Sequence, residues 1–155
     1  MIRCSILFIL LLINNSVIAA PQTLNKSFAQ NSWSIVSLPG IPLNPGPEAM
    51  FSTLGGVSLL RWAAPNQSLI SYSELDPELF GNLIMTAGYW VIPTMSATDM
   101  SYSGLNDNET VDMWISLPKT GWTFIGNPYQ HNVVWADVKV TNGKITKSML
   151  EKIDR

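Results

Sequence analysis

The sequence predicts an all-β protein, either an antiparallel sandwich or a partly open barrel with one or two short helices. Charged residues make up only 13% of the chain. Short apolar stretches recur at close spacing, and each is bounded by Gly, Pro, Ser, Thr or Asn. Several short strands separated by turn residues in this way are typical of small β-sandwiches and barrels.

The first residues have the features of a signal peptide. Arg3 supplies a positive charge, Ser5–Ile13 is an apolar run, and small or tolerated residues lead up to Ala19. A membrane anchor needs about 20 apolar residues, and Asn14 interrupts this run too early, although an uncleaved anchor is the alternative. We therefore expect residues 1–19 to be removed, no stable membrane span afterwards, and a secreted or cell-surface location.

The mature chain after residue 19 has the size of one domain. The only cysteine, Cys4, lies in the signal peptide, which excludes disulfides, thiolate metal sites and a cysteine nucleophile. Basic residues are concentrated after Leu117, but apolar residues separate them as in a solvated hairpin and helix. We therefore expect no nucleic-acid partner.

The first half of the chain contains most of the expected strands. Residues 20–32 read as a polar leader, and a single β-domain is expected over 33–155. Pro47 favours one helical turn over 47–51, and a short helix is expected after Asp76-Pro77. The loop AAPNQ at 63–67 has the length of a hairpin connection. Strands are expected at 33–39, 57–62, 68–73, 88–93 and 99–104.

The second half predicts two hairpins and a final helix. The segments 111–118 and 121–128 are expected to pair across Lys119-Thr120. The segments 133–140 and 144–147 flank Asn142-Gly143, a strong hairpin signal. Ser148 with Glu151 three residues later resembles a capping box that starts a helix.

An internal similarity links the two halves. WSIVSLP at 33–39 and WTFIGNP at 122–128 are both apolar stretches that begin with Trp and end with Pro. The domain therefore contains one full and one partial repeat, or its last strands close a single unit. We favour the single domain.

The stretch GWTFIGNPYQHNVVW at 121–135 resembles a motif of exported bacterial proteins, G-W-x-x-I-G-N-P-Y/F followed by a Trp. WSIVSLP and the GYWV stretch at 88–91 match companion features of that family of β-rich modules. The resemblance implies a bacterial surface or secreted protein, but it carries no active site that can be transferred. This chain differs in having Val134 where the family has an acidic residue.

The sequence favours a protein that is not an enzyme and carries no cofactor. No nucleophile elbow, zinc-protease or nucleotide-binding motif is present. His131 is the only histidine, so a histidine-rich metal site is excluded, and its neighbours read as a solvated loop. No metal site is assigned, although calcium binding at Asp107, Glu109 and Asp112 is left open.

The runner-up interpretation is a small secreted hydrolase that uses Asp or Glu residues. Glu74, Asp76 and Glu78 could contain a carboxylate pair of the glycosidase kind. We expect no deep cleft in so small a β-domain, so an acidic surface turn is the preferred interpretation. A spacer domain without a ligand is the other alternative.

The most specific functional hypothesis is a stacking surface built from aromatic side chains. Tyr89 and Trp90 are neighbours in an expected strand, so they must face opposite sides of the sheet and one should be more exposed. Exposed rings would contact a polysaccharide or another cell-surface component in a structural, adhesive or carbohydrate-contacting role; the oligomeric state is not predicted. The candidate ligand-binding residues are Trp62, Tyr72, Trp90, Tyr102, Tyr129 and Trp135.

Overall fold

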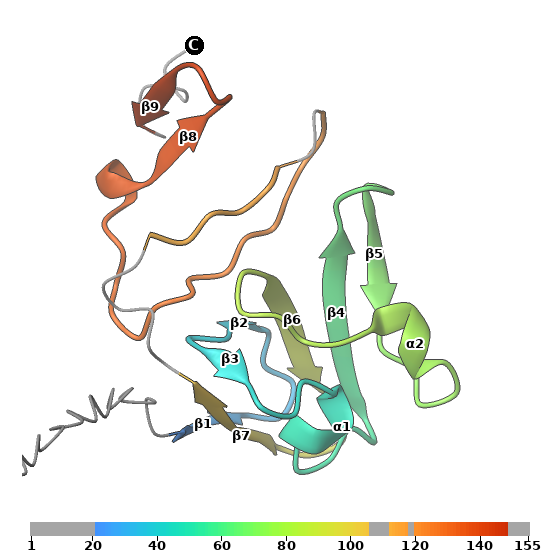
Figure 1. Cartoon of the computed structure of the whole chain (residues 1–155). Coiled ribbons are helices and arrows are strands. Elements are labelled where there is room, and N and C mark those ends of the chain that lie inside the picture. Colours follow the sequence, from blue (N-terminus) through green and yellow to red (C-terminus); the bar gives the residue numbers. More distant parts are fainter. Residues whose placement is uncertain (1–20, 106–111, 118–119, 149–155) are drawn as a thin grey trace, which may run out of the picture.

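The computed structural model describes residues 21–105, 112–117 and 120–148. Within these residues the chain is mostly β, and its two α-helices are single turns (Figure 1). The helices are α1 (Pro47–Met50) and α2 (Pro77–Phe80). The strands are β1 (Gln22–Phe28), β2 (Ser34–Ser37), β3 (Ile41–Pro42), β4 (Val57–Ala63), β5 (Ser68–Ser71), β6 (Gly88–Pro93), β7 (Thr98–Leu105), β8 (Lys139–Thr141) and β9 (Thr146–Ser148).

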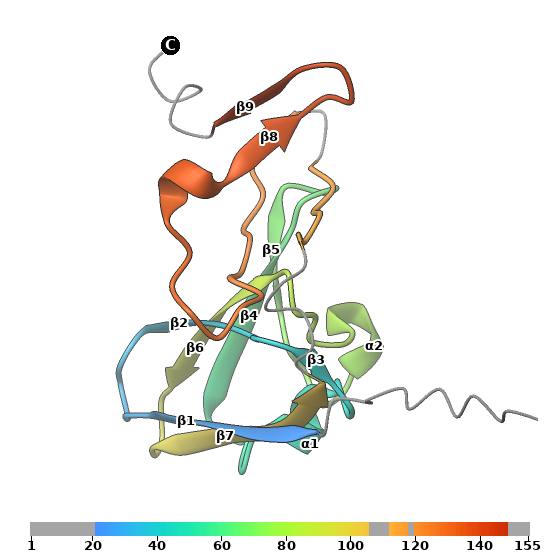
Figure 2. The ribbon, with the colours of Figure 1, turned by 60° about the vertical axis from the view of Figure 1, so that its left-hand side comes forward.

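Two antiparallel sheets form a sandwich-like body, which confirms the predicted fold class. One sheet has the order β1-β7-β3 and the other β2-β6-β4-β5. In Figure 2, β1 and β7 run across the lower ends of β4 and β6. No closed barrel forms among the described strands. The core between the sheets includes Phe28, Leu38, Met50, Leu59, Phe80, Leu83, Tyr89, Val91, Met100 and Tyr102.

The segment expected to be a polar leader is a full strand of the first sheet, which corrects the predicted domain start. β1 pairs with β7 along its whole length, from Gln22 opposite Gly104 to Phe28 opposite Thr98. Phe28 is 1% exposed and packs against Phe51, with 6.1 Å between ring centroids. Five of the seven residues of β1 are polar, and for this reason the apolar pattern did not reveal the strand.

The strands of the second sheet lie where the sequence predicts them. In β6, Tyr89 and Val91 are buried while Trp90 is only half-buried, as the alternation requires. The β4–β5 hairpin turns at residues 64–67. The predicted helical turns form as α1 and α2, and the side chain of Asp76 caps α2 by accepting a hydrogen bond from Leu79 N.

The chain beyond β7 is more irregular than predicted. The described parts of 112–117 and 120–134 are extended but form no ladder with each other, so the first expected hairpin is wrong. The second hairpin is confirmed as β8 and β9, joined through Asn142 and Gly143. The segment before it contains a 3-10 turn, η1 (Trp135–Asp137), instead of a strand. The helix expected after Ser148 lies outside the described residues.

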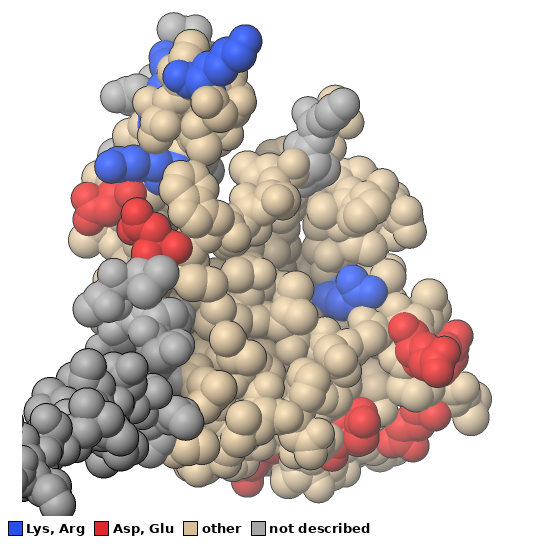
Figure 3. Space-filling view, viewed as in Figure 1, with Lys and Arg blue, Asp and Glu red and all other residues tan. Residues whose placement is uncertain are grey.

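Acidic side chains gather around α2, and basic side chains gather in the C-terminal hairpin. Glu74, Asp76 and Glu78 cluster in and beside α2, whereas Lys144 and Lys147 lie in the C-terminal hairpin (Figure 3). A membrane-crossing helix, long and apolar, is not found in the part of the chain that is described.

Candidate functional site: a pocket above the closing segment

Residues 121–130, here called the closing segment, lie across the outer face of the second sheet, where they contact Trp62 and Trp90. Near its start, Trp122 O accepts hydrogen bonds from Trp62 Nε1 at 2.9 Å and from Gln67 Nε2 at 3.0 Å. Gln67 Oε1 also accepts a hydrogen bond from Trp122 N at 2.6 Å. The β4–β5 hairpin therefore fixes the entry of the closing segment through three hydrogen bonds.

The middle of the closing segment packs tightly against the start of β6. The Phe124 ring stacks on Trp90, with centroids 4.1 Å apart and planes 14° from parallel. Gly126 N donates a hydrogen bond to Thr86 O at 2.9 Å. A β-carbon added at Gly126 would meet the backbone carbonyl of Ala87 and would lie 2.6 Å from Ser37 Cβ. Only glycine fits here, between Ala87 just before β6 and Ser37 in β2, without a shift of the backbone.

The Asn-Pro-Tyr turn ends the closing segment with local hydrogen bonds. Asn127 Oδ1 accepts a hydrogen bond from Tyr129 N at 3.0 Å, and Asn127 Nδ2 donates to His131 O at 2.8 Å. The Tyr129 ring stacks on the imidazole of His131 at 5.2 Å. Beyond the turn, Gln130 Nε2 donates to Gln22 Oε1 at 3.0 Å. The turn thus brings the closing segment to the beginning of β1.

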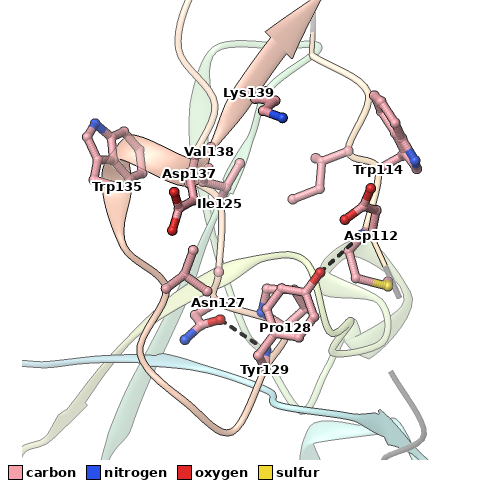
Figure 4. A pocket seen from close by; sticks show the side chains of 14 residues that line it. Asp112, Trp114, Ile125, Asn127, Pro128, Tyr129, Trp135, Asp137, Val138 and Lys139 are labelled. Carbon is pink, nitrogen blue, oxygen red and sulfur yellow. Dashed lines mark hydrogen bonds between the residues drawn. The ribbon is translucent and has the colours of Figure 1, made fainter. Parts of the chain in front are cut away.

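A pocket of about 380 Å³ lies on the side of the closing segment that faces away from the sandwich. Ile125, Gly126 and Asn127 belong to its floor, and Tyr129 OH accepts a hydrogen bond from Met113 N at 3.1 Å. Residues 112–115 form one wall, and residues between 133 and 139 form the other (Figure 4). The sandwich itself therefore does not hold this pocket; irregular C-terminal segments build it outside the two sheets.

The pocket combines aromatic rings with charged groups. Trp114 and Trp135 stand on opposite walls and are 73% and 44% exposed. Asp112 and Asp137 also lie on opposite walls, and Lys139 lies at the rim near β8 (Figure 4). Such a site offers apolar ring faces, hydrogen-bond acceptors and one flexible cationic donor.

The six aromatic residues chosen from the sequence do not form one site. Tyr129 and Trp135 line the pocket. Trp62 and Trp90 lie on the second sheet, where Trp122 and Phe124 of the closing segment contact them.

Of the remaining two candidates, Tyr102 belongs to the core and Tyr72 packs against it, which corrects their assignment to one stacking surface. Tyr102 is 5% exposed, between the sheets, and its hydroxyl has no hydrogen-bond partner among the described residues. Burial raises the pKa of Tyr102 to about 12. Tyr72 packs edge-on against the buried ring of Phe80, with 5.7 Å between centroids. Tyr102 therefore presents no face to a ligand, whereas Tyr72, just after β5, is half-buried with its ring packed against the core.

The sequence pattern does not mark Trp114, Asp137 or Lys139 as ligand-binding residues, and it marks Asp112 only as a calcium candidate. Asp107 and Glu109, the other calcium candidates, lie outside the described residues. Within residues 21–105, 112–117 and 120–148, no group of three or more His, Cys, Asp or Glu side chains is placed to hold a metal ion.

The acidic residues of the hydrolase hypothesis lie elsewhere. Glu74, Asp76 and Glu78 are exposed around α2 and do not line the pocket, and Asp76 serves as the cap of α2. His131 is exposed against the Tyr129 ring. In comparisons with known proteins, no family model, curated protein or solved structure matches the chain.

Proposed function

We propose that this protein is an exported, non-catalytic β-module that binds carbohydrate in the pocket above the closing segment. The observation that carries the proposal is the placement of Trp114 and Trp135 on opposite walls, with Asp112 on the wall of Trp114 and Asp137 on the wall of Trp135. Sugar rings have apolar C–H faces and a rim of hydroxyl groups. Indole rings pack well on the C–H faces, and carboxylate oxygens accept hydrogen bonds from the hydroxyl groups.

The size and openness of the site support the same ligand class. A volume of about 380 Å³ falls in the range of small-molecule pockets, about 300–1,000 Å³. Both carboxylates are exposed, so they do not need a permanent ionic partner and can exchange water for ligand hydroxyls. An oligosaccharide can therefore enter the pocket without a large rearrangement of the sandwich.

Export is part of this proposal. The signal-peptide pattern of residues 1–19 and the resemblance to exported bacterial modules both support a secreted or surface location, where polysaccharides are accessible. Detection of the protein in the cytoplasm with residues 1–19 still attached would contradict it.

The binding test uses an array of plant, fungal and bacterial oligosaccharides, followed by titration of the strongest hit. Trp114→Ala and Trp135→Ala should each weaken binding at least tenfold, because stacking on each ring is lost. Trp33→Ala is the matched control, since Trp33 is similarly exposed at 70% but lies outside the pocket. Unchanged affinity in both pocket variants would refute the proposed site.

A second candidate function follows from the same two carboxylates. Asp112 and Asp137 reach the pocket from opposite walls, as the acid and base of a glycosidase must. Their exposure favours a binding role, because a general acid works best where an apolar setting keeps it protonated. Release of reducing sugar from the bound oligosaccharide, abolished in Asp137→Asn, would establish hydrolysis instead.

A further inference from the structure

The pocket above the closing segment has two walls of matching chemistry. Asp112 and Trp114 are two residues apart in an extended segment, so their side chains project to the same side of the chain. On the opposite wall, Trp135 and Asp137 stand at the two ends of the 3-10 turn η1 (Figure 4). Each wall therefore presents one indole ring and one carboxylate to the same space.

The charged side chains of the pocket give it a negative balance. Of its 14 lining residues, only Asp112, Asp137 and Lys139 are charged at neutral pH. Two carboxylates against one ammonium group leave a net charge of −1. Because like charges that meet in a binding site cost free energy, a ligand with positive charge is favoured over one with negative charge.

The chain does not itself neutralise these carboxylates. Among the described residues, neither Asp112 nor Asp137 forms an ion pair or a side-chain hydrogen bond, and Lys139 at the rim is bonded to neither of them. Both carboxylates are exposed, so solvent satisfies them in the free protein. A donor group of a ligand can therefore replace that solvent without breaking a bond within the chain.

The indole rings favour the same kind of ligand. The face of a tryptophan ring attracts a cation that lies within about 6 Å of its centre, and it does so better than the other aromatic side chains. Trp114 and Trp135 are both exposed, so their rings are open to a ligand. An ammonium group held between the walls gains attraction from a ring and from a carboxylate, whereas a neutral group at the same place gains packing alone.

We propose that the ligand of this pocket is an amino sugar whose amino group is free and protonated, as in a chain of glucosamine units. The inference rests on the proposed carbohydrate binding and narrows it to cationic oligosaccharides. The sugar supplies C–H faces to the indole rings, its ammonium group pairs with Asp112 and Asp137, and Lys139 donates a hydrogen bond to a hydroxyl group. An acidic sugar would instead bring its own carboxylate against those of the pocket.

Titration calorimetry at about pH 6 tests this proposal with two oligosaccharides of equal length, one of glucosamine and one of N-acetylglucosamine. Acetylation removes the positive charge and keeps the sugar ring. The folded wild type should bind the glucosamine oligomer about tenfold more tightly, because exposed ion pairs and cation–π contacts each contribute a few-fold.

Variants of the charged residues locate the source of this preference. Asp112→Asn and Asp137→Asn should each lower it about threefold, because each removes one partner of the ammonium group. Lys139→Gln should raise it about twofold, because the opposing cation is lost. Glu78→Gln is the matched control, since Glu78 is an exposed carboxylate of α2 that does not line the pocket. Circular dichroism confirms that each variant is folded.

The possible failures of this proposal and of the carbohydrate function are distinguishable. Equal or tighter binding of the N-acetyl oligomer, still weakened by Trp114→Ala, would keep the carbohydrate site and refute the free amine. A preference that survives in both Asp→Asn variants would place the ammonium group outside the pocket. An oligolysine of the same charge that binds as tightly would reduce the effect to charge attraction without a sugar. Absence of binding to every oligosaccharide would refute both proposals.

Discussion

Replacement of Gly126 by alanine tests whether the packing of the closing segment against the second sheet stabilises the protein. The added methyl group would meet the backbone carbonyl of Ala87 and lie 2.6 Å from Ser37 Cβ. Neither contact is the tip of a flexible side chain, so the backbone must move. Overpacking of this kind costs about 1–3 kcal/mol, and loss of the 2.9 Å hydrogen bond to Thr86 O adds about 1 kcal/mol. We expect the free energy of unfolding to fall by about 2–4 kcal/mol.

Urea denaturation followed by tryptophan fluorescence measures this change. Gly55→Ala is the matched control, because its nearest neighbour, Thr53 Oγ1, lies at an ordinary 3.7 Å and its backbone conformation suits alanine. The control should stay within about 0.5 kcal/mol of the wild type. If Gly126→Ala is equally mild, the closing segment is not packed against the sandwich as the structure shows.

Three further perturbations probe individual contacts. In a double-mutant cycle, Trp90→Ala and Phe124→Ala should show a coupling energy of about 0.5–1.5 kcal/mol from the stacked rings, and a value near zero would contradict the stack. Burial raises the pKa of Tyr102 from its usual 10 to about 12. The free energy of unfolding should therefore fall as the pH rises from 10 to 12, by on the order of 1–2 kcal/mol, because the unfolded chain loses the Tyr102 proton first. Tyr102→Phe should reduce this slope and, by removing an unpaired buried hydroxyl, should match or exceed wild-type stability at pH 7. Asp76→Ala removes the side chain that accepts a hydrogen bond from Leu79 N, and it should lower the free energy of unfolding by about 0.5–1 kcal/mol. An unchanged midpoint of thermal unfolding would show that this cap does not stabilise the protein.

The strands that were predicted correctly are those in which local pattern and tertiary packing agree. GYWVIP alternates in burial as a half-buried strand should, and it forms β6 at the predicted bounds. Asp76-Pro77 correctly predicted α2, because the capping side chain of Asp76 and the fixed φ angle of Pro77 both act on the first turn of the helix. Asn142-Gly143 gave the last hairpin for the same local reason, with Gly143 at φ 84°.

The errors arise where partners far along the chain decide the structure. β1 is polar in five of its seven residues and is a strand only because β7, about 75 residues later, supplies its partner. Tyr102 was assigned to a surface because nothing local shows which face of β7 is covered. The pocket was missed because its walls, 112–115 and 133–139, are irregular segments that no periodicity marks.

The two sides of the closing segment explain why its sequence is dense in aromatic and turn residues. Phe124 faces the sheet and stacks on Trp90, whereas Ile125 and Asn127 line the pocket. A ligand held on one side therefore rests on backbone that the sandwich holds on the other. Since the pocket floor exists only when the closing segment is docked, a ligand that binds the docked form must also stabilise it, by about 2.7 kcal/mol at a hundred times its dissociation constant. Bound oligosaccharide should then restore the stability of Gly126→Ala more than that of any destabilised variant outside the closing segment.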